Sequence, residues 1–214
     1  MATYASIKYD MDLSSNATGT GAMTLLSTQT ASSSATISFT SGIDSTYKEY
    51  IFKFYDIHPS NDGEEFTFQA DTGTNTSYNQ TITSTYFLAE HNEAGTSTGL
   101  TYQTSRDLAQ ATSFQHFGVD TGNDLAQGTG FQILHQIGSD NDQAGCGTLH
   151  LYDPSNTTFV KHFMGTLQQA HQNDLSLVGY VSGYWNTTTA ITRVQFKMSS
   201  GTIDAGVIKL YGVS

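Results

Sequence analysis

Apolar and polar residues alternate along most of this chain with the period of two that is typical of β-strands. In the segment 47–58, the aromatic residues at even positions share one face of the expected strand, and the residues at odd positions, Ile57 among them, share the other. From Val194 to Met198 the even positions are apolar and the odd positions are polar. This second segment is therefore predicted to be a half-buried antiparallel strand with one face in water.

Strands separated by turns rich in Gly, Asn and Asp predict an all-β protein. We expect an antiparallel β-sandwich with a jelly-roll-like topology, and an up-and-down barrel is the alternative. The last two strands should form a hairpin through 199–201, and 105–110 is either a short helix with Ser105 as its N-cap or part of a long loop. Strands are expected at 36–40, 47–58, 66–69, 78–89, 130–137, 147–152, 158–166, 175–185, 190–198 and 206–213. In the segment 78–89, Ile82 and Phe87 are expected to lie in the core.

The first 33 residues differ in composition from the rest. They are rich in Ser, Thr and Gly, which bury little apolar surface, and two apolar clusters interrupt them. Such a segment is either an arm that becomes ordered against a partner subunit or an ordinary first strand with long loops. We divide the chain into an N-terminal arm or attachment segment, residues 1–33, and a single β-sandwich domain, residues 34–214. The candidate attachment residues are Met23, Leu25 and Leu26.

The charge balance argues against nucleic acid and membrane surfaces as partners. The chain has 8 Lys and Arg against 19 Asp and Glu, a net charge of −11, and its basic residues are scattered. Binding to phosphate backbones or anionic lipids requires a basic stripe or cluster. Only 13% of the residues are charged, and the many Thr, Tyr and Phe residues favour strands instead.

The single cysteine, Cys146, cannot form an intrachain disulfide and is expected to be a buried, inert thiol. The N-terminus lacks the basic and apolar regions of a signal peptide, and no stretch of about 18 apolar residues is present. We therefore expect synthesis in a cytoplasm, with any location outside the cell reached as part of a particle.

The histidines and acidic clusters match no metal or catalytic motif. His91 and Glu93 share one face of a strand, but His150 and His162 belong to other strands, and a metal site needs three or four converging ligands. The acidic loop 139–143 lacks the spacing of an EF-hand, and the sequence contains no nucleophile elbow or phosphate-binding loop. We predict no catalytic, cofactor-binding or metal-binding residues, no cofactor, and a non-enzymatic protein.

The segment 179–186 is the one best suited to binding, because it combines aromatic rings with amide and hydroxyl groups. Aromatic faces can stack on sugar rings while amides bond to the hydroxyl groups. A core strand that carries the only Trp and ends at a turn has the same composition. The candidate glycan or interface contacts are Tyr184, Trp185 and Asn186.

Two stretches of the chain also resemble a known family. The first reads ISFTSGIDSTYKEY from Ile37 and continues to Pro59, and the second reads VQFKMSSGTIDAGVIKLYGV from Val194. Both resemble virion structural proteins of marine tailed phages, including those that infect cyanobacteria and their planktonic neighbours. The similarity extends from Ala35 to the C-terminus, and the segments 161–163 and 184–188 also fit.

The resemblance implies a virion component, and it carries over no catalytic or ligand residue. The expected role is a capsid decoration or fibre protein, made in the host cytoplasm, that forms a homo-oligomer, in particular a homotrimer, and docks on other virion proteins such as capsid or tail proteins. The alternative is a tail-fibre receptor-binding module that recognises host surface glycans. A glycan depolymerase is a third possibility, which requires a pair of carboxylates in a cleft.

Overall fold

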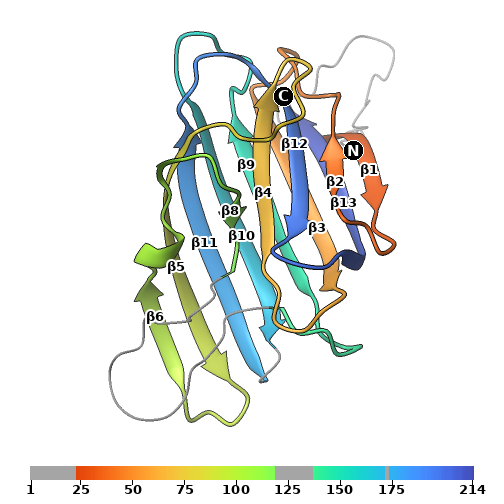
Figure 1. Ribbon diagram of the computed structural model, residues 1–214, viewed down its shortest axis with the longest axis vertical. Coiled ribbons are helices and arrows are strands. Elements are labelled where there is room, and N and C mark those ends of the chain that lie inside the picture. The colour runs from red at the N-terminus through yellow and green to blue at the C-terminus, as the bar shows by residue number, and fades with distance from the viewer. Residues whose placement is uncertain (1–22, 119–136, 172–173) are drawn as a thin grey trace, which may run out of the picture.

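The computed structural model describes residues 23–118, 137–171 and 174–214, which form a β-sandwich of two antiparallel sheets (Figure 1). The larger sheet contains, in order, β1 (Met23–Thr30), β13 (Ile203–Val213), β3 (Glu49–Pro59), β9 (Gly145–Tyr152), β10 (Lys161–His171), β11 (Leu175–Trp185), β5 (Ile82–Asn92) and β6 (Thr98–Tyr102), with β7 (Ala109–Ala111) paired to β5. The smaller sheet contains β2 (Ile37–Phe39), β12 (Ile191–Met198), β4 (Phe66–Thr72) and β8 (Gln115–His116).

The predicted all-β antiparallel sandwich is confirmed. The four-stranded sheet covers one face of the nine-stranded sheet, and within the described ranges no other sheet lies over the opposite face (Figure 1). The described residues contain more strands than the eight of a jelly roll, and β9, β10 and β11 follow one another as neighbours in a meander. The expected strand 130–137 lies outside the described residues except for Ile137, which forms isolated bridges.

Aromatic side chains from both sheets fill the core. Phe196 of β12 contacts Phe54 of β3 with ring centroids 5.2 Å apart, and Phe68 of β4 contacts Trp185 of β11 at 6.0 Å. These pairs are edge-on, as the quadrupole of an aromatic ring favours. Burial of the alternate residues Val194, Phe196 and Met198 confirms the half-buried strand that the sequence predicts there.

A β-bulge in β3 changes the predicted face of one residue. The pairing of β3 with β9 shifts register between Phe54 and Ile57, and Asp56 has a positive φ of 50°. An extra residue in one strand reverses the inward and outward alternation beyond it. Ile57 is therefore fully buried, like Phe54, and its assignment to the opposite face from the period of two was wrong.

The expected hairpin through 199–201 is also wrong. β12 belongs to the four-stranded sheet and β13 to the nine-stranded sheet, so the connection crosses from one sheet to the other. The turn at 199–201 was predicted correctly, but the two strands that it joins do not pair with each other. At 105–110, the structure contains a single 3-10 turn, η1 (Thr104–Arg106), followed by extended chain.

The described part of the N-terminal segment is an ordinary edge strand. β1 pairs antiparallel with β13 from Met23 to Thr30, with an irregularity between Leu25 and Ser27. Residues 23–33 are thus attached to the sandwich, whereas the rest of the predicted arm lies outside the described residues.

Candidate binding face

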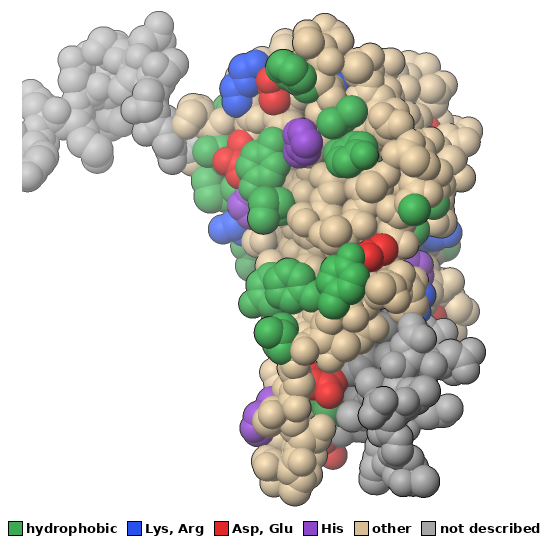
Figure 2. Space-filling view, turned by 90° about the vertical axis from the view of Figure 1, so that its left-hand side faces the viewer, with side chains coloured by type: hydrophobic (Ala, Val, Ile, Leu, Met, Phe, Trp, Pro, Cys, Tyr) green, Lys and Arg blue, Asp and Glu red, His purple; other side chains and the backbone are tan. Residues whose placement is uncertain are grey.

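The uncovered face of the nine-stranded sheet, which we call the outer face, exposes several large apolar side chains. Met164 is 55% exposed, Phe87 42%, Tyr180 38% and Tyr152 37%. Figure 2 shows the β5 flank of the molecule, where hydrophobic side chains stand in separate groups with other side chains and backbone between them. Exposed aromatic side chains that gather on one face often mark a binding surface.

Seven residues of the outer face lie in one continuous register across seven strands, and we call them the long row. Cross-strand neighbours on one face stand about 5 Å apart, so these side chains form a line across the sheet. The row begins with two basic residues, continues with two hydroxyl groups and ends with three aromatic rings. From β13 to β6 its members are Lys209, Lys53, Thr148, Thr166, Tyr180, Phe87 and Tyr102.

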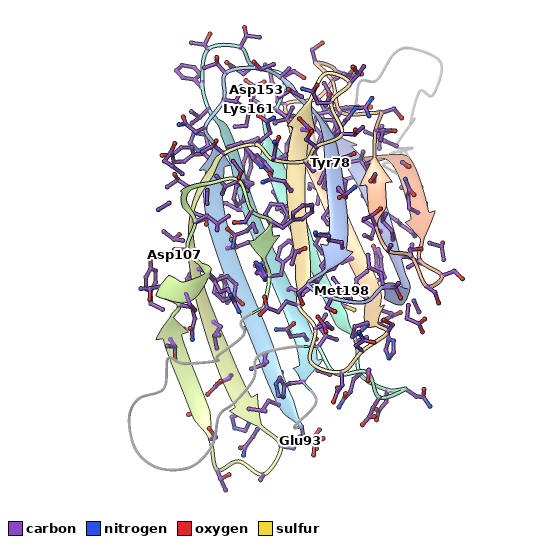
Figure 3. All side chains as sticks on the ribbon, in the orientation of Figure 1. Tyr78, Glu93, Asp107, Asp153, Lys161 and Met198 are labelled. Atoms are coloured by element: carbon purple, nitrogen blue, oxygen red, sulfur yellow. The ribbon has the colours of Figure 1, made fainter. Side chains whose placement is uncertain are left out.

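At the aromatic end, the rings of Phe87 and Tyr180 are stacked, with centroids 4.9 Å apart and planes inclined by 13°. The next ring, Tyr102, donates its hydroxyl hydrogen to Asp107, and that hydrogen bond raises the pKa of Tyr102. Asp107 also accepts a 2.8 Å hydrogen bond from the backbone nitrogen of Tyr86, so the carboxylate is held in place (Figure 3).

Two adjoining hollows border the long row. The first, of about 260 Å³, lies over β9, β10, β11 and β5, and the second, of about 500 Å³, extends along the same strands to Thr83 and Tyr184. Hydroxyl groups stand among the apolar walls, and those of Thr85 and Ser182 are 3.0 Å apart. The first hollow is lined by Phe87, Thr148, His150, Tyr152, Met164, Gly165, Thr166, Tyr180, Val181 and Ser182.

At the basic end, Lys53 and Lys209 are directly opposite each other on β3 and β13. Each ammonium lies over an aromatic ring: Lys53 is 5.6 Å from the ring centre of Tyr211, and Lys209 is 5.2 Å from that of Tyr55. Within the described residues, neither lysine has a carboxylate at ion-pair distance. Two like charges opposite each other repel, so this end of the row is suited to an anion.

Several titratable groups elsewhere are held in structural contacts. Glu65, 2% exposed, accepts a 2.6 Å hydrogen bond from Arg106 Nη2 and also pairs with His116. The Nζ atom of buried Lys161 donates to the carbonyl oxygen of Phe159 at 2.6 Å. Burial lowers the pKa of Lys161, and nearby Asp153 partly opposes that shift (Figure 3). These groups stabilise loops rather than converge on a cavity.

The candidate contacts Tyr184, Trp185 and Asn186 do not form one surface. Trp185 is fully buried and donates a 2.7 Å hydrogen bond to Gln69, so its ring cannot stack on a sugar. Tyr184 is partly exposed, lines the larger hollow and contacts His162 with ring centres 6.1 Å apart. Asn186 is exposed and donates to Gln110 at 2.6 Å. Of the three, only Tyr184 belongs to the outer-face hollows.

The attachment candidates lie on β1, at the edge of the same sheet. Met23 is 41% exposed and Leu25 52% exposed, whereas Leu26 packs against the core. The first two are accessible to a partner, and Leu26 has a structural role.

Cys146 is exposed, so its predicted burial was wrong. It is an outward-facing residue of β9, and its sulfur accepts a 3.4 Å hydrogen bond from the backbone nitrogen of Asp56 at the β3 bulge. His91 and Glu93 border a polar hollow of about 350 Å³ together with the acidic loop. The described ranges contain no group of three or more side chains placed to hold a metal ion.

Phe87 is a binding-face residue that the sequence reasoning placed in the core. Its segment suggested a strand with Ile82 and Phe87 in the core, but the two residues are an odd number of positions apart and must lie on opposite faces. Ile82 is fully buried and Phe87 is exposed, so the core assignment of Phe87 was wrong. The odd spacing from Ile82 in the sequence would have assigned Phe87 to the opposite, exposed face. Tyr180 belongs to the segment 179–186 that the sequence singled out.

Comparison with protein-family models, curated proteins and solved structures finds no match for this chain. No helix in the described part of the chain is long and apolar enough to span a membrane. The arguments for function therefore rest on the residues of this protein.

Proposed function

We propose that this chain is a non-enzymatic structural protein on the surface of a phage virion, of the capsid decoration or fibre class. It acts by docking on other virion proteins and by associating with copies of itself, with a trimer as the expected assembly. Its location is then the virion, after synthesis in the host cytoplasm.

One observation carries the docking part of this proposal. The apolar residues Met23 and Leu25 are exposed on an edge strand of the sheet. Edge strands present unpaired backbone groups, and natural proteins usually protect them with charges, Pro or a covering segment. An edge with exposed apolar side chains and no charged residue from Met23 to Thr30 is suited to a protein contact. The resemblance of 37–59 and 194–213 to virion proteins supports the particle as the place of that contact.

The non-enzymatic part of the proposal is supported by the contacts of the titratable groups, which are made within the fold. Buried Glu65 is paired with Arg106 and His116, and buried Lys161 donates to a backbone carbonyl, so these groups have partners within the fold. The outer face presents mainly aromatic rings and hydroxyl groups, a composition that is suited to binding, and its His150 is paired with Glu49 at 2.7 Å.

The decisive experiment is to purify the virions from a host culture and measure this chain in them. We expect the chain to sediment with intact particles in many copies per particle, and near-atomic imaging to place β1 against a neighbouring subunit. If the chain is absent from purified particles, the proposal is wrong.

Matched β1 variants test the attachment. The double variant Met23→Ser/Leu25→Ser should fold normally and be incorporated poorly into particles, because only exposed side chains are changed. Leu26→Ala should lower the free energy of unfolding by about 2 kcal/mol instead, because this side chain packs on the core. Normal incorporation of the double variant would contradict the attachment role of β1.

A further inference from the structure

We propose that the outer face binds an acidic glycan, which lies across the strands along the long row. One sugar ring stacks on the Phe87–Tyr180 pair, its neighbours bond to the hydroxyl groups of Thr166 and Thr148, and an acidic substituent contacts Lys53 and Lys209. This inference concerns a ligand and goes beyond the structural role in a virion.

The aromatic end has the geometry of a stacking platform. Phe87 and Tyr180 are nearly parallel to each other and both remain about two-fifths exposed, although each stands on a central strand of the sandwich. Aromatic side chains exposed in this way bury a large area against the apolar face of a ring while they lose little conformational freedom. The neighbouring ring of Tyr102, held by its bond to Asp107, extends the platform to the sheet edge.

The middle of the row supplies neutral hydrogen-bonding groups. Thr148 and Thr166 are cross-strand neighbours, and both line the smaller hollow. Ser182 on β11 lines the same hollow, and its hydroxyl oxygen is 3.0 Å from that of Thr85. Hydroxyl groups both donate and accept hydrogen bonds, so they are suited to the hydroxyl groups of sugars.

The hydroxyl groups also make an apolar protein helix a poor fit. Such a helix would need a continuous apolar groove, whereas the hydroxyl groups of Thr148, Thr166 and Ser182 stand in the walls of the smaller hollow. A glycan carries both apolar ring faces and hydroxyl groups, and these match the aromatic end and the hydroxyl-bearing middle of the row.

The lysine pair specifies an acidic ligand. Lys53 is the register neighbour of Thr148, so its backbone stands one strand, about 4.8 Å, from the edge of the hollow, and its long side chain places the ammonium over Tyr211 on β13. Tyr180 is three strands from Lys53, roughly 14 Å, which a short oligosaccharide can span. The chain carries a net charge of −11, so two adjacent lysines on this face are a local feature and do not reflect a generally basic surface. A carboxylate or sulfate between them relieves their mutual repulsion.

The test uses the purified full-length protein and glycans of defined charge. A glycan array with carboxylated, sulfated, phosphorylated and neutral members identifies the class. Calorimetric titrations with an oligogalacturonide, a heparin-derived hexasaccharide and maltohexaose then measure affinity. We expect at least one acidic class to bind, at least tenfold more tightly than maltohexaose, and the affinity to fall with added salt because the contact is ionic.

Matched variants locate the site. Phe87→Ala and Tyr180→Ala should each weaken acidic-glycan binding at least tenfold, whereas Phe159→Ala, an exposed aromatic residue outside the row, should leave it unchanged. Lys53→Gln/Lys209→Gln should remove the preference for acidic glycans. Lys197→Gln is its control, since Lys197 also lies over an aromatic ring, that of Phe114 at 4.2 Å, but belongs to the other sheet.

Three outcomes would overturn the proposal. The first is that no acidic glycan on the array binds to the wild-type protein. The second is binding that the Phe87 and Tyr180 variants leave unchanged. The third is self-association that Tyr180→Ala abolishes, which would identify the outer face as a contact between copies. Presence of the chain in purified virions is measured separately, so the glycan site and the virion role can fail independently.

Discussion

The indole nitrogen of Trp185 on β11 donates a 2.7 Å hydrogen bond to the side-chain oxygen of Gln69 on β4, and this bond joins the two sheets within the core. The amide nitrogen of Gln69 donates in turn to the carbonyl oxygens of Gln80, Thr112 and Ser113. One fully buried side chain therefore connects both sheets and two loop segments. Trp185, the only Trp of the chain, therefore stabilises the core and does not contact a ligand.

Replacement of Gln69 by Leu should lower the free energy of unfolding by about 3 kcal/mol, because the Trp185 donor and several loop carbonyls lose their partner in the core. Urea unfolding followed by the fluorescence of Trp185, the single Trp, measures this change directly. Gln168→Ala, on the exposed side of β10, is the control and should change stability by less than about 0.5 kcal/mol. A Gln69→Leu variant as stable as the wild type would show that the hydrogen bonds of Gln69 do not contribute to the free energy of unfolding.

Gly179 leaves the space that Tyr86 occupies. A Cβ atom at this position would lie 2.1 Å from the Tyr86 hydroxyl and 2.6 Å from the carbonyl oxygen of Phe117, which that hydroxyl bonds at 2.8 Å. Gly179→Ala should therefore lower the free energy of unfolding by about 1–3 kcal/mol through overpacking and a disturbed hydrogen bond. In Gly99→Ala, the new Cβ meets only the flexible side chain of Glu90, so its melting temperature should stay close to that of the wild type.

Arg106 compensates the buried charge of Glu65. Arg106→Met should lower the free energy of unfolding by about 3–5 kcal/mol, because it leaves a nearly buried carboxylate without its guanidinium. Lys48→Met breaks the exposed pair with Asp153 and should cost less than about 1 kcal/mol. The two variants are compared by chemical denaturation at neutral pH, and equal losses of stability would contradict the structural role of the buried pair.

His171 should make the stability of the protein depend on pH. Burial lowers the pKa of this imidazole to about 4, whereas in the unfolded chain the pKa stays near the ordinary histidine value of 6.5. Between these values, the unfolded state takes up a proton that the folded state does not. The free energy of unfolding should therefore fall as the pH falls from 6.5 to 4, by at most about 3 kcal/mol.

His171→Gln should flatten this part of the pH profile. Denaturant unfolding of the wild type and the variant at intervals between pH 4 and pH 7 gives the two curves, and their difference isolates the contribution of His171. A variant that retains the full slope would assign the effect to other groups.

The alternation of residue types predicted the strands well where one face is buried. It succeeded for Val194, Phe196 and Met198 because each inward position is apolar and no irregularity interrupts the strand. It failed at Ile57 because a bulge is set by pairing with β9, which lies far away in the sequence. The polar turn at 199–201 also predicted a pairing of β12 with β13, although the two strands belong to different sheets.

The candidate site was found only in part, for a related reason. The segment 179–186 was correctly chosen as rich in binding groups, but the strand directs Tyr180 and Tyr184 outward and Trp185 inward. A side chain's chemistry is visible in the sequence, whereas the face on which it stands depends on which side of the sheet is covered.

The sequence by itself determined that this protein is an antiparallel β-sandwich, because alternation and turn residues are local properties. Only the tertiary structure decided the register that aligns Lys209, Lys53, Thr148, Thr166, Tyr180, Phe87 and Tyr102 in one row. These residues come from strands spread over more than 150 positions of the chain. Backbone hydrogen bonds between distant strands bring them together, and no local pattern encodes that pairing.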